Sequence, residues 1–209
     1  WHDKNSTDGI VVISQLLSPV TMVSLNFTFG NDSGYLNDPY RVITFAGSGL
    51  PYAEIRPGHR NKEIVYISLT QFFDSVNASL EGSYRFHHDS HGIFSHTAQL
   101  TWHQHLGPYL MVEPTFRFYG QSAADFYYPT VPGYFPTDPI PRPAFYSADY
   151  RLSELYTLDY GAQLTGVIND HLRVVAGYHR YEMHGLDGTT PSAAYPKANV
   201  FTVGLSILW

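Results

Sequence analysis

Polar and apolar residues alternate with a period of two along much of this chain, the pattern of β-strands that have one apolar face. The pattern is clearest in the closing segment, residues 199–209, where Thr202, Gly204 and Ser206 share the polar phase. The apolar phase of this segment is Phe201, Val203, Leu205, Ile207 and Trp209. The alternation predicts a final strand with one apolar side.

Eight further segments show the same alternation, separated by residues typical of turns. They are residues 10–17, 21–30, 61–72, 76–86, 93–105, 110–119, 148–165 and 171–183. Pro114 interrupts one of them and is best placed at a β-bulge. The chain is therefore predicted to be a single all-β domain over residues 1–209, with nine antiparallel strands connected up and down.

The predicted connections alternate between two kinds. Tight turns are expected near Ser18, Asp74, Gly107 and Asn169, whereas longer connections follow the other strand ends. The long loops cover about residues 31–60, 120–147 and 184–197, with a His-rich hairpin as the remaining connection. This alternation matches the short periplasmic turns and longer outer loops of transmembrane β-barrels.

Composition narrows the class of protein. Charged residues are 14% of the chain, against about 25% in a typical soluble domain, and there are 17 tyrosines. With three lysines (Lys4, Lys62 and Lys197) and a net charge of -6, a nucleic-acid-binding groove is not expected. The absence of cysteine excludes disulfides, thiolate zinc sites and cysteine nucleophiles.

A membrane-spanning helix is also not expected, because no run of apolar residues approaches the ~18 that such a helix needs. A chain of this composition that crosses a membrane has to do so as a β-barrel. The polar phase is mostly Ser, Thr, Asn, Gln and Gly, which suits a hydrated lumen, while the aromatic-rich phase suits lipid. The alternative is a soluble sandwich or lipocalin-like barrel with the phases reversed.

The final strand resembles the C-terminal signature that the assembly machinery of bacterial outer-membrane barrels reads. This resemblance implies the bacterial outer membrane as the location, with the lipid bilayer and lipopolysaccharide as further partners. Nine strands with tight turns in the periplasm would leave Trp1 outside the cell, whereas such barrels usually have an even strand number. We therefore expect strands upstream of Trp1 and a larger, even-stranded barrel, in which this chain is the C-terminal part.

Six segments are distinctive in combination: residues 33–40, 84–97 and 121–127, with 14–15, 56–57 and 147–153. Together they resemble an uncharacterised family of predicted bacterial outer-membrane proteins, classed as a domain of unknown function. Members of that family are longer, and the second segment usually carries Trp where this chain has His91. Gene neighbours of the family hint at a redox context, and no catalytic residues are established for it.

Charged and imidazole side chains on the polar phase are expected to face the lumen. They are Glu81, Arg85, His103, Glu113, Arg117, Asp159, Arg173 and His179. Two arrangements are open: a paired network that stiffens the barrel wall, or an ion-selective constriction. His105 shares the phase of His103, and lining of the pore is favoured over metal binding for both.

One hairpin is rich in imidazole and carboxylate groups, which suit a loop-bound divalent metal. Its candidate ligands are His87, His88, Asp89, His91 and His96. His87 and His88 point to opposite faces of a strand, so a solvated hairpin without metal is the competing interpretation.

Two other groups of residues, a candidate calcium site and a candidate catalytic triad, each have a competing interpretation. The loop residues Asn31, Asp32, Asn37 and Asp38 offer oxygen ligands for calcium but are also ordinary turn residues. A catalytic triad of Ser95, His96 and Asp89 is disfavoured, because neighbouring residues of a strand face opposite sides.

Three functions of different classes follow. The first is a pore for small solutes, and the second is a barrel that anchors or sheathes a partner complex, docked on the loop over residues 121–146. An enzyme is the weakest of the three. We expect a non-enzymatic role, with no cofactor beyond a loop-bound metal.

Overall fold

The computed structural model describes residues 3–47, 49–131, 143–169 and 171–207. Nine long strands form one antiparallel sheet in which each strand lies beside its neighbours in the chain. The strands are β1 (Lys4–Ser18), β2 (Thr21–Gly34), β5 (His59–Phe73), β6 (Ala78–Asp89), β7 (Phe94–Leu106), β8 (Leu110–Gln121), β9 (Leu155–Asn169), β10 (Leu172–Gly185) and β11 (Lys197–Ile207). The prediction of nine up-and-down strands is confirmed.

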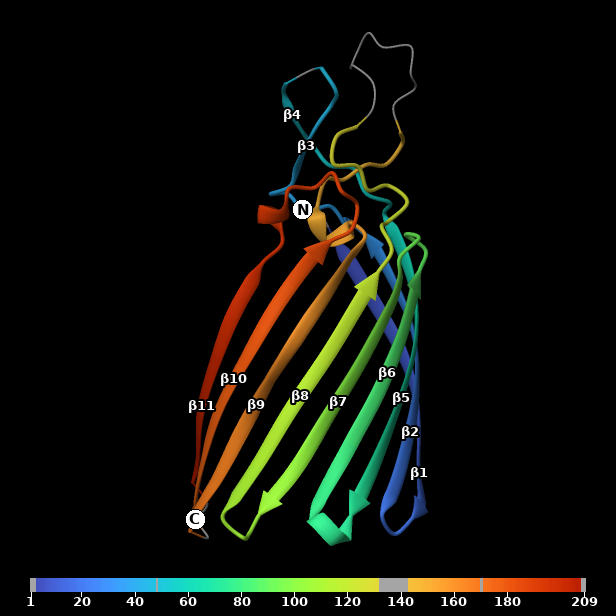
Figure 1. Cartoon of the computed structure of the whole chain (residues 1–209). Helices are drawn as coiled ribbons and strands as arrows, with labels where there is room; N and C mark the ends of the chain where they lie inside the picture. The colour runs from blue at the N-terminus through green and yellow to red at the C-terminus, as the bar shows by residue number, and fades with distance from the viewer. Residues whose placement is uncertain (1–2, 48, 132–142, 170, 208–209) are drawn as a thin grey trace.

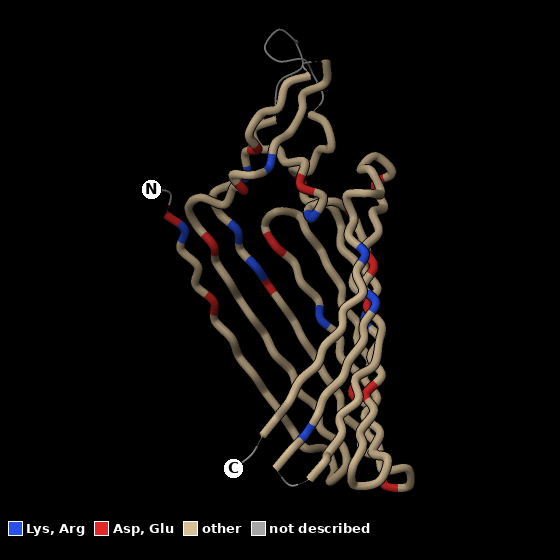
Figure 2. Tube along the Cα trace, turned by 90° about the vertical axis from the view of Figure 1, so that its left-hand side faces the viewer, with Lys and Arg blue, Asp and Glu red and all other residues tan. Residues whose placement is uncertain are grey.

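The sheet is curved into a trough and is not closed (Figures 1 and 2). Within the described residues, β1 pairs with β2 alone and β11 pairs with β10 alone, so both edges are free. The described chain holds no helix long and apolar enough to cross a membrane. Its helices are single turns: η1 (Asp74–Val76), η2 (Tyr150–Leu152) and η3 (Ser192–Ala194).

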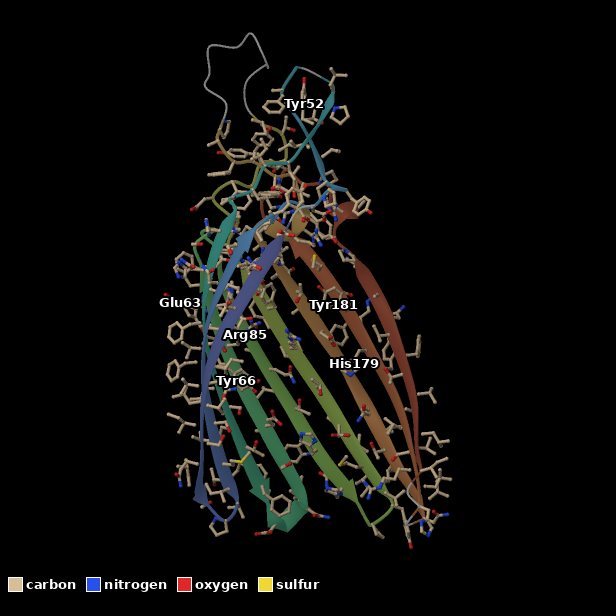
Figure 3. All side chains as sticks on the ribbon, turned by 180° about the vertical axis from the view of Figure 1, so that it is seen from behind. Tyr52, Glu63, Tyr66, Arg85, His179 and Tyr181 are labelled. Carbon is tan, nitrogen blue, oxygen red and sulfur yellow. The ribbon has the colours of Figure 1, made fainter. Side chains whose placement is uncertain are left out.

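The two phases of each strand become the two faces of the trough. On β5, Val65, Ile67 and Leu69 are exposed on the convex face, while Tyr66 on the other phase is less exposed. Figure 3 shows Tyr66, Arg85, His179 and Tyr181 pointing into the hollow of the trough. The predicted alternation therefore gives an apolar convex face and a polar concave face, and neither is covered by a second layer within the described residues.

The three long connections meet at one end of the sheet and pack into a structure that we call the cap: residues 35–58, 122–131, 143–154 and 186–196. The cap includes the small antiparallel pair β3 (Val42–Thr44) and β4 (Pro51–Ala53). Its apolar core is Ile43, Phe45, Val131 and Tyr146, and a second cluster at the sheet end is Ile93, Ala124 and Phe126. Because the convex face of the sheet is exposed, most of the buried apolar core lies at the cap end.

Some predicted boundaries are wrong. β2 continues to Gly34 and β1 begins at Lys4, since the polar segment 4–9 pairs along residues 29–34. The strand predicted from residue 148 begins at Leu155, because the preceding residues belong to the cap. Pro114 forms no bulge: the β7–β8 register is the same on both sides of it, and only the pairing beside it is missing.

Candidate functional site

Ion pairs line the upper part of the concave face on β1, β2, β5 and β6. Lys62 Nζ lies 3.3 Å from Asp8 Oδ1 and 3.2 Å from Asp32 Oδ2. Arg60 donates to Asp89 Oδ2 through Nε at 2.7 Å, and the Asp89 carboxylate is fully buried. Figure 2 shows that most charged residues lie in this upper half of the trough and in the cap.

Imidazoles take the place of lysine and arginine lower on the concave face. His103 Nδ1 lies 2.7 Å from Glu113 Oε1, and its Nε2 lies 3.9 Å from Glu81 Oε2. On the β9–β10 wall, His179 Nδ1 lies 2.8 Å from Asp159 Oδ1. The carboxylates predicted to face the lumen are thus all beside a histidine. Glu81 and Glu113 do not pair with the arginine four residues along their own strands.

Three arginines on this face have no ion pair. Among the described residues, no carboxylate oxygen lies within 4.0 Å of the guanidinium of Arg85, Arg117 or Arg173. Arg117 lies opposite Asp159 in the β8–β9 register, but that carboxylate turns to His179. Within the part of the chain that the structure describes, the concave face therefore carries three guanidinium groups without an ion pair.

A pocket of about 280 Å³ lies on the concave face between the sheet and the cap. Arg117 and Asp159 form its lower part, and Arg151 reaches it from the cap. The tyrosines Tyr119 and Tyr181 line its walls, together with Gln121, Leu155, Thr157 and Met183. The pocket thus combines a free cation, hydroxyl groups and an apolar wall.

The cap above this pocket is held by a charged cluster centred on Asp149, whose side chain is 1% exposed. Arg56 Nη2 donates to Asp149 at 2.9 Å and to Glu54 at 3.0 Å. Arg151 also donates to Asp149, and its Nη2 donates to Asp38 at 2.9 Å. Glu54 accepts from the Ser147 hydroxyl and from the backbone N–H of Asp38. These contacts join residues 35–58 to residues 143–154.

The pKa values of the cap carboxyls reflect this cluster. Burial alone would raise the pKa of Asp149, but the hydrogen bonds and positive charge of Arg151 and Arg56 hold it below its ordinary value. The pKa of Asp38 is also lowered, first by the hydrogen bond from the Tyr40 backbone and then by Arg151. Both carboxyls are therefore ionised in the folded cap at neutral pH.

A second polar contact within the cap ties residues 122–131 to the loop after β10. The Tyr127 hydroxyl donates to Asp187 Oδ2 at 3.1 Å and also contacts the Thr190 hydroxyl. Burial raises the pKa of Tyr127 to about 12. The three long connections are thus linked to one another by polar contacts as well as by the apolar core.

The five residues proposed for a metal are divided between the two faces. His87 and Asp89 lie on the concave side, whereas His88 stacks on Phe94 and His96 bonds to Tyr84 on the convex side. Asp89 instead pairs with Arg60 and accepts from the backbone N–H groups of His91 and Ile93, which orders the hairpin turn. Across the described ranges, no group of three His, Asp or Glu side chains could hold a metal ion.

His91 itself is directed away from the other histidines. Its Nε2 donates to the carbonyl of His59 at 3.0 Å, and its ring lies edge-on against Phe126. Burial lowers the pKa of His91, which favours the neutral ring. The residue therefore serves as a packed contact between the hairpin and the cap.

The calcium candidates are likewise separated. Asn31 bonds to Asn61, Asp32 accepts from Ser6, and Asn37 accepts from the backbone N–H of Arg56. Asp38 belongs to the cap cluster described above. The oxygens of Asp32, Asn37 and Asp38 therefore each accept from a structural partner, while Asn31 donates through its Nδ2.

The triad drawn from the sequence has the geometry expected of neighbouring strand residues. Ser95 lies opposite His87 on the concave side, while His96 lies on the convex side. Asp89 is committed to Arg60. Ser95 and His96 therefore do not approach each other as a nucleophile and a base would.

The apolar phase of β11 lies on the convex face and is exposed. Val203 is 84% exposed and Phe201 is 76% exposed, with Leu205 and Ile207 in line below them. Trp209, the last residue of the predicted assembly signal, lies outside the described residues. The described part of the strand thus presents an uncovered apolar edge of the sheet.

Sequence reasoning missed the residues that organise the cap and the upper ion pairs. They are Glu54, Arg56, Arg60, Asp149 and Arg151. A signal was available, because charged residues are scarce in this chain and four of these five lie in or beside loops rich in Pro, Gly and Ser. Their partners could not be assigned, since Arg56 and Asp149 are 93 residues apart.

Comparison with known proteins adds one finding. No curated protein matches the sequence. A family model described as "Protein of unknown function (DUF3570)" matches residues 1–200. Because this match covers nearly the whole chain, the chain belongs to the family of proteins of unknown function DUF3570.

Proposed function

We propose that the nine strands form the wall of a transmembrane β-barrel in the bacterial outer membrane, whose polar lumen passes small solutes. The observation that carries the proposal is the exposed apolar convex face, opposite a concave face of charged and hydroxyl side chains. A soluble protein rarely leaves an apolar surface of this extent uncovered. In a barrel, lipid covers it and water fills the other side.

Closure of the barrel follows from strand direction. Strands β1 and β11 run the same way, because nine strands alternate in direction between them. Antiparallel closure of the two free edges requires an odd number of additional strands, which gives the larger, even-stranded barrel predicted from the sequence. Full closure removes both unpaired edges, as a barrel in lipid requires.

The orientation follows from the connections. The four short turns lie in the periplasm and the cap lies outside the cell, where lipopolysaccharide surrounds the upper end of the sheet. The exposed apolar phase of β11 is then the segment available to the barrel assembly machinery.

An anchoring role is the second candidate, and one feature of the cap favours it. The cap has its own apolar core and ion pairs, yet it exposes Tyr40 at 92%. A rigid surface with an exposed aromatic side chain suits a protein partner. In that case the barrel holds a partner complex at the outer loops.

The proposal is tested by reconstituting the complete protein into liposomes after extraction from outer membranes in mild detergent. The pore proposal expects uptake of small sugars or ions by these liposomes and none by liposomes with heat-unfolded protein. Protein that inserts but passes no solute, and that co-purifies with a fixed partner, would establish the anchoring role instead. A protein recovered in the soluble fraction would overturn both.

A further inference from the structure

We infer that the concave face binds small organic oxyanions, carboxylates or phosphates, at Arg117 in the pocket under the cap, with Arg85 as a second cation. This inference deepens the proposed function, on which it rests, by naming the class of solute. The total charge of the chain is negative, but a solute in the trough meets the local charges of the concave face.

Each carboxylate of this face lies beside a lysine, an arginine or a histidine, whereas these two arginines lie beside no carboxylate oxygen of the described residues. Asp8 and Asp32 lie beside Lys62, Asp89 beside Arg60, Asp159 beside His179, and Glu81 and Glu113 beside His103. Arg85 and Arg117 have no carboxylate within 4.0 Å among the described residues. Arg85 is partly buried and Arg117 is exposed toward the hollow of the trough. A guanidinium that lacks an internal partner is a ready site for an anion.

The register brings the two arginines toward one region of the hollow. Arg85 on β6 lies opposite Thr97, and Arg117 on β8 lies opposite Gln99, two residues further along β7. The two arginines lie two strands apart across the sheet and two residues apart along it. Their Cα atoms are therefore about 12 Å apart. The curvature of the trough directs both side chains inward, and Figure 3 shows Arg85 pointing into the hollow.

The pocket at Arg117 offers a place for the rest of the solute. Leu155 and Met183 give it an apolar wall, and Tyr119 and Tyr181 give it aromatic surfaces with hydroxyl groups. Arg151 adds no free charge, because it is bound by Asp149 and Asp38. The planar guanidinium of Arg117 matches a carboxylate or phosphate through two parallel hydrogen bonds.

Asp159 does not occupy this site itself. It lies across from Arg117 in the register, but its Oδ1 is 2.8 Å from His179 Nδ1 on the next strand. The guanidinium of Arg117 therefore remains open on the side that faces the hollow.

Binding is measured first, by isothermal titration calorimetry of the complete protein in detergent with inorganic phosphate and with benzoate as probes. We expect binding to the unmodified protein, and at least tenfold weaker binding to the double variant Arg85→Gln/Arg117→Gln, since one charge-assisted bond contributes at least that factor. Arg173→Gln is the matched control, because it removes an arginine from the far end of the same face that likewise has no ion pair among the described residues. Its affinity should be unchanged.

Conductance is measured separately, as the reversal potential across a bilayer with a salt gradient. An anion-selective current that becomes less selective in the double variant supports the inference. If both probes bind and the double variant loses binding, anion binding is supported even where no current is found, and only the pore proposal fails.

If current flows without anion preference and neither probe binds, the pore proposal stands and anion binding is overturned. Equal binding by all variants also overturns anion binding at these arginines.

Discussion

Arg56 and Asp149 meet in the cap at 2.9 Å, although 93 residues separate them in the chain. The Asp149 carboxylate is almost fully buried and the Arg56 side chain is 15% exposed. This pair joins the loop after β2 to the segment before β9. It is one of the contacts by which connections from the two halves of the sheet become one structure.

Replacing Asp149 with Asn should loosen the cap while leaving the sheet folded. The change leaves the buried charge of Arg56 with Glu54 as its remaining partner, and breaking a buried pair typically costs about 3–5 kcal/mol. Hydrogen exchange of backbone amides over residues 35–58 should rise, with little change in the strands. Glu63→Gln is the control, because its exposed pair with His88 should contribute less than about 1 kcal/mol. Equal exchange in both variants would contradict the role given to Asp149.

The cap should lose stability in acid. The pKa values of Asp149 and Asp38 are lowered in the folded state, so the unfolded cap binds protons first as the pH falls. The stabilisation is fully present above the ordinary carboxyl pKa of about 4 and is lost as the pH falls through the lower folded values. Near-ultraviolet circular dichroism of the cap tyrosines should report this loss below about pH 4. In Asp149→Asn, the acid transition should be shallower. An unchanged transition would mean that groups other than Asp149 cause the loss of cap structure in acid.

Gly161 should not tolerate a side chain. A Cβ atom there would lie 2.1 Å from the carbonyl oxygen of Tyr178 and 2.7 Å from the Cα of His179, so β9 and β10 would have to separate. Gly161→Ala should therefore reduce the yield of folded protein. Gly177→Ala is the matched control on the same face, since its nearest new contact is 3.6 Å. Folding is read from the shift between unheated and heated samples in gel electrophoresis, and similar yields for both variants would refute the close approach.

A charge on the convex face of β11 should be more harmful than one on its concave face. Val203 is 84% exposed on the convex side, and Thr202 is its neighbour on the concave side. If lipid covers the convex face, Val203→Arg costs about 2–4 kcal/mol near the bilayer midplane, while Thr202→Arg faces water. Denaturant unfolding of protein in lipid vesicles measures the difference. Equal stability of the two variants would contradict the membrane assignment.

Much of the sheet was determined by the sequence alone. Period-two alternation is local, so segments such as 61–72 and 199–207 revealed their strands and their apolar face without any partner. The short turns near Ser18 and Gly107 also followed from local residues. For the same reason, the eight charged and histidine residues predicted on the polar phase were assigned to one face before their partners were known.

Tertiary structure decided the partners. Glu81 and Glu113 pair with His103 on neighbouring strands, not with the arginines of their own strands, because side chains of adjacent strands lie closer than residues four apart on one strand. The sequence predicts the cap only as loops, since its order comes from contacts such as Arg56 with Asp149 that no local pattern encodes. The alternation of the sequence already places His87 and His88 on opposite faces. The ion pair of Asp89 with Arg60 is decided by the tertiary structure, which brings the two residues together.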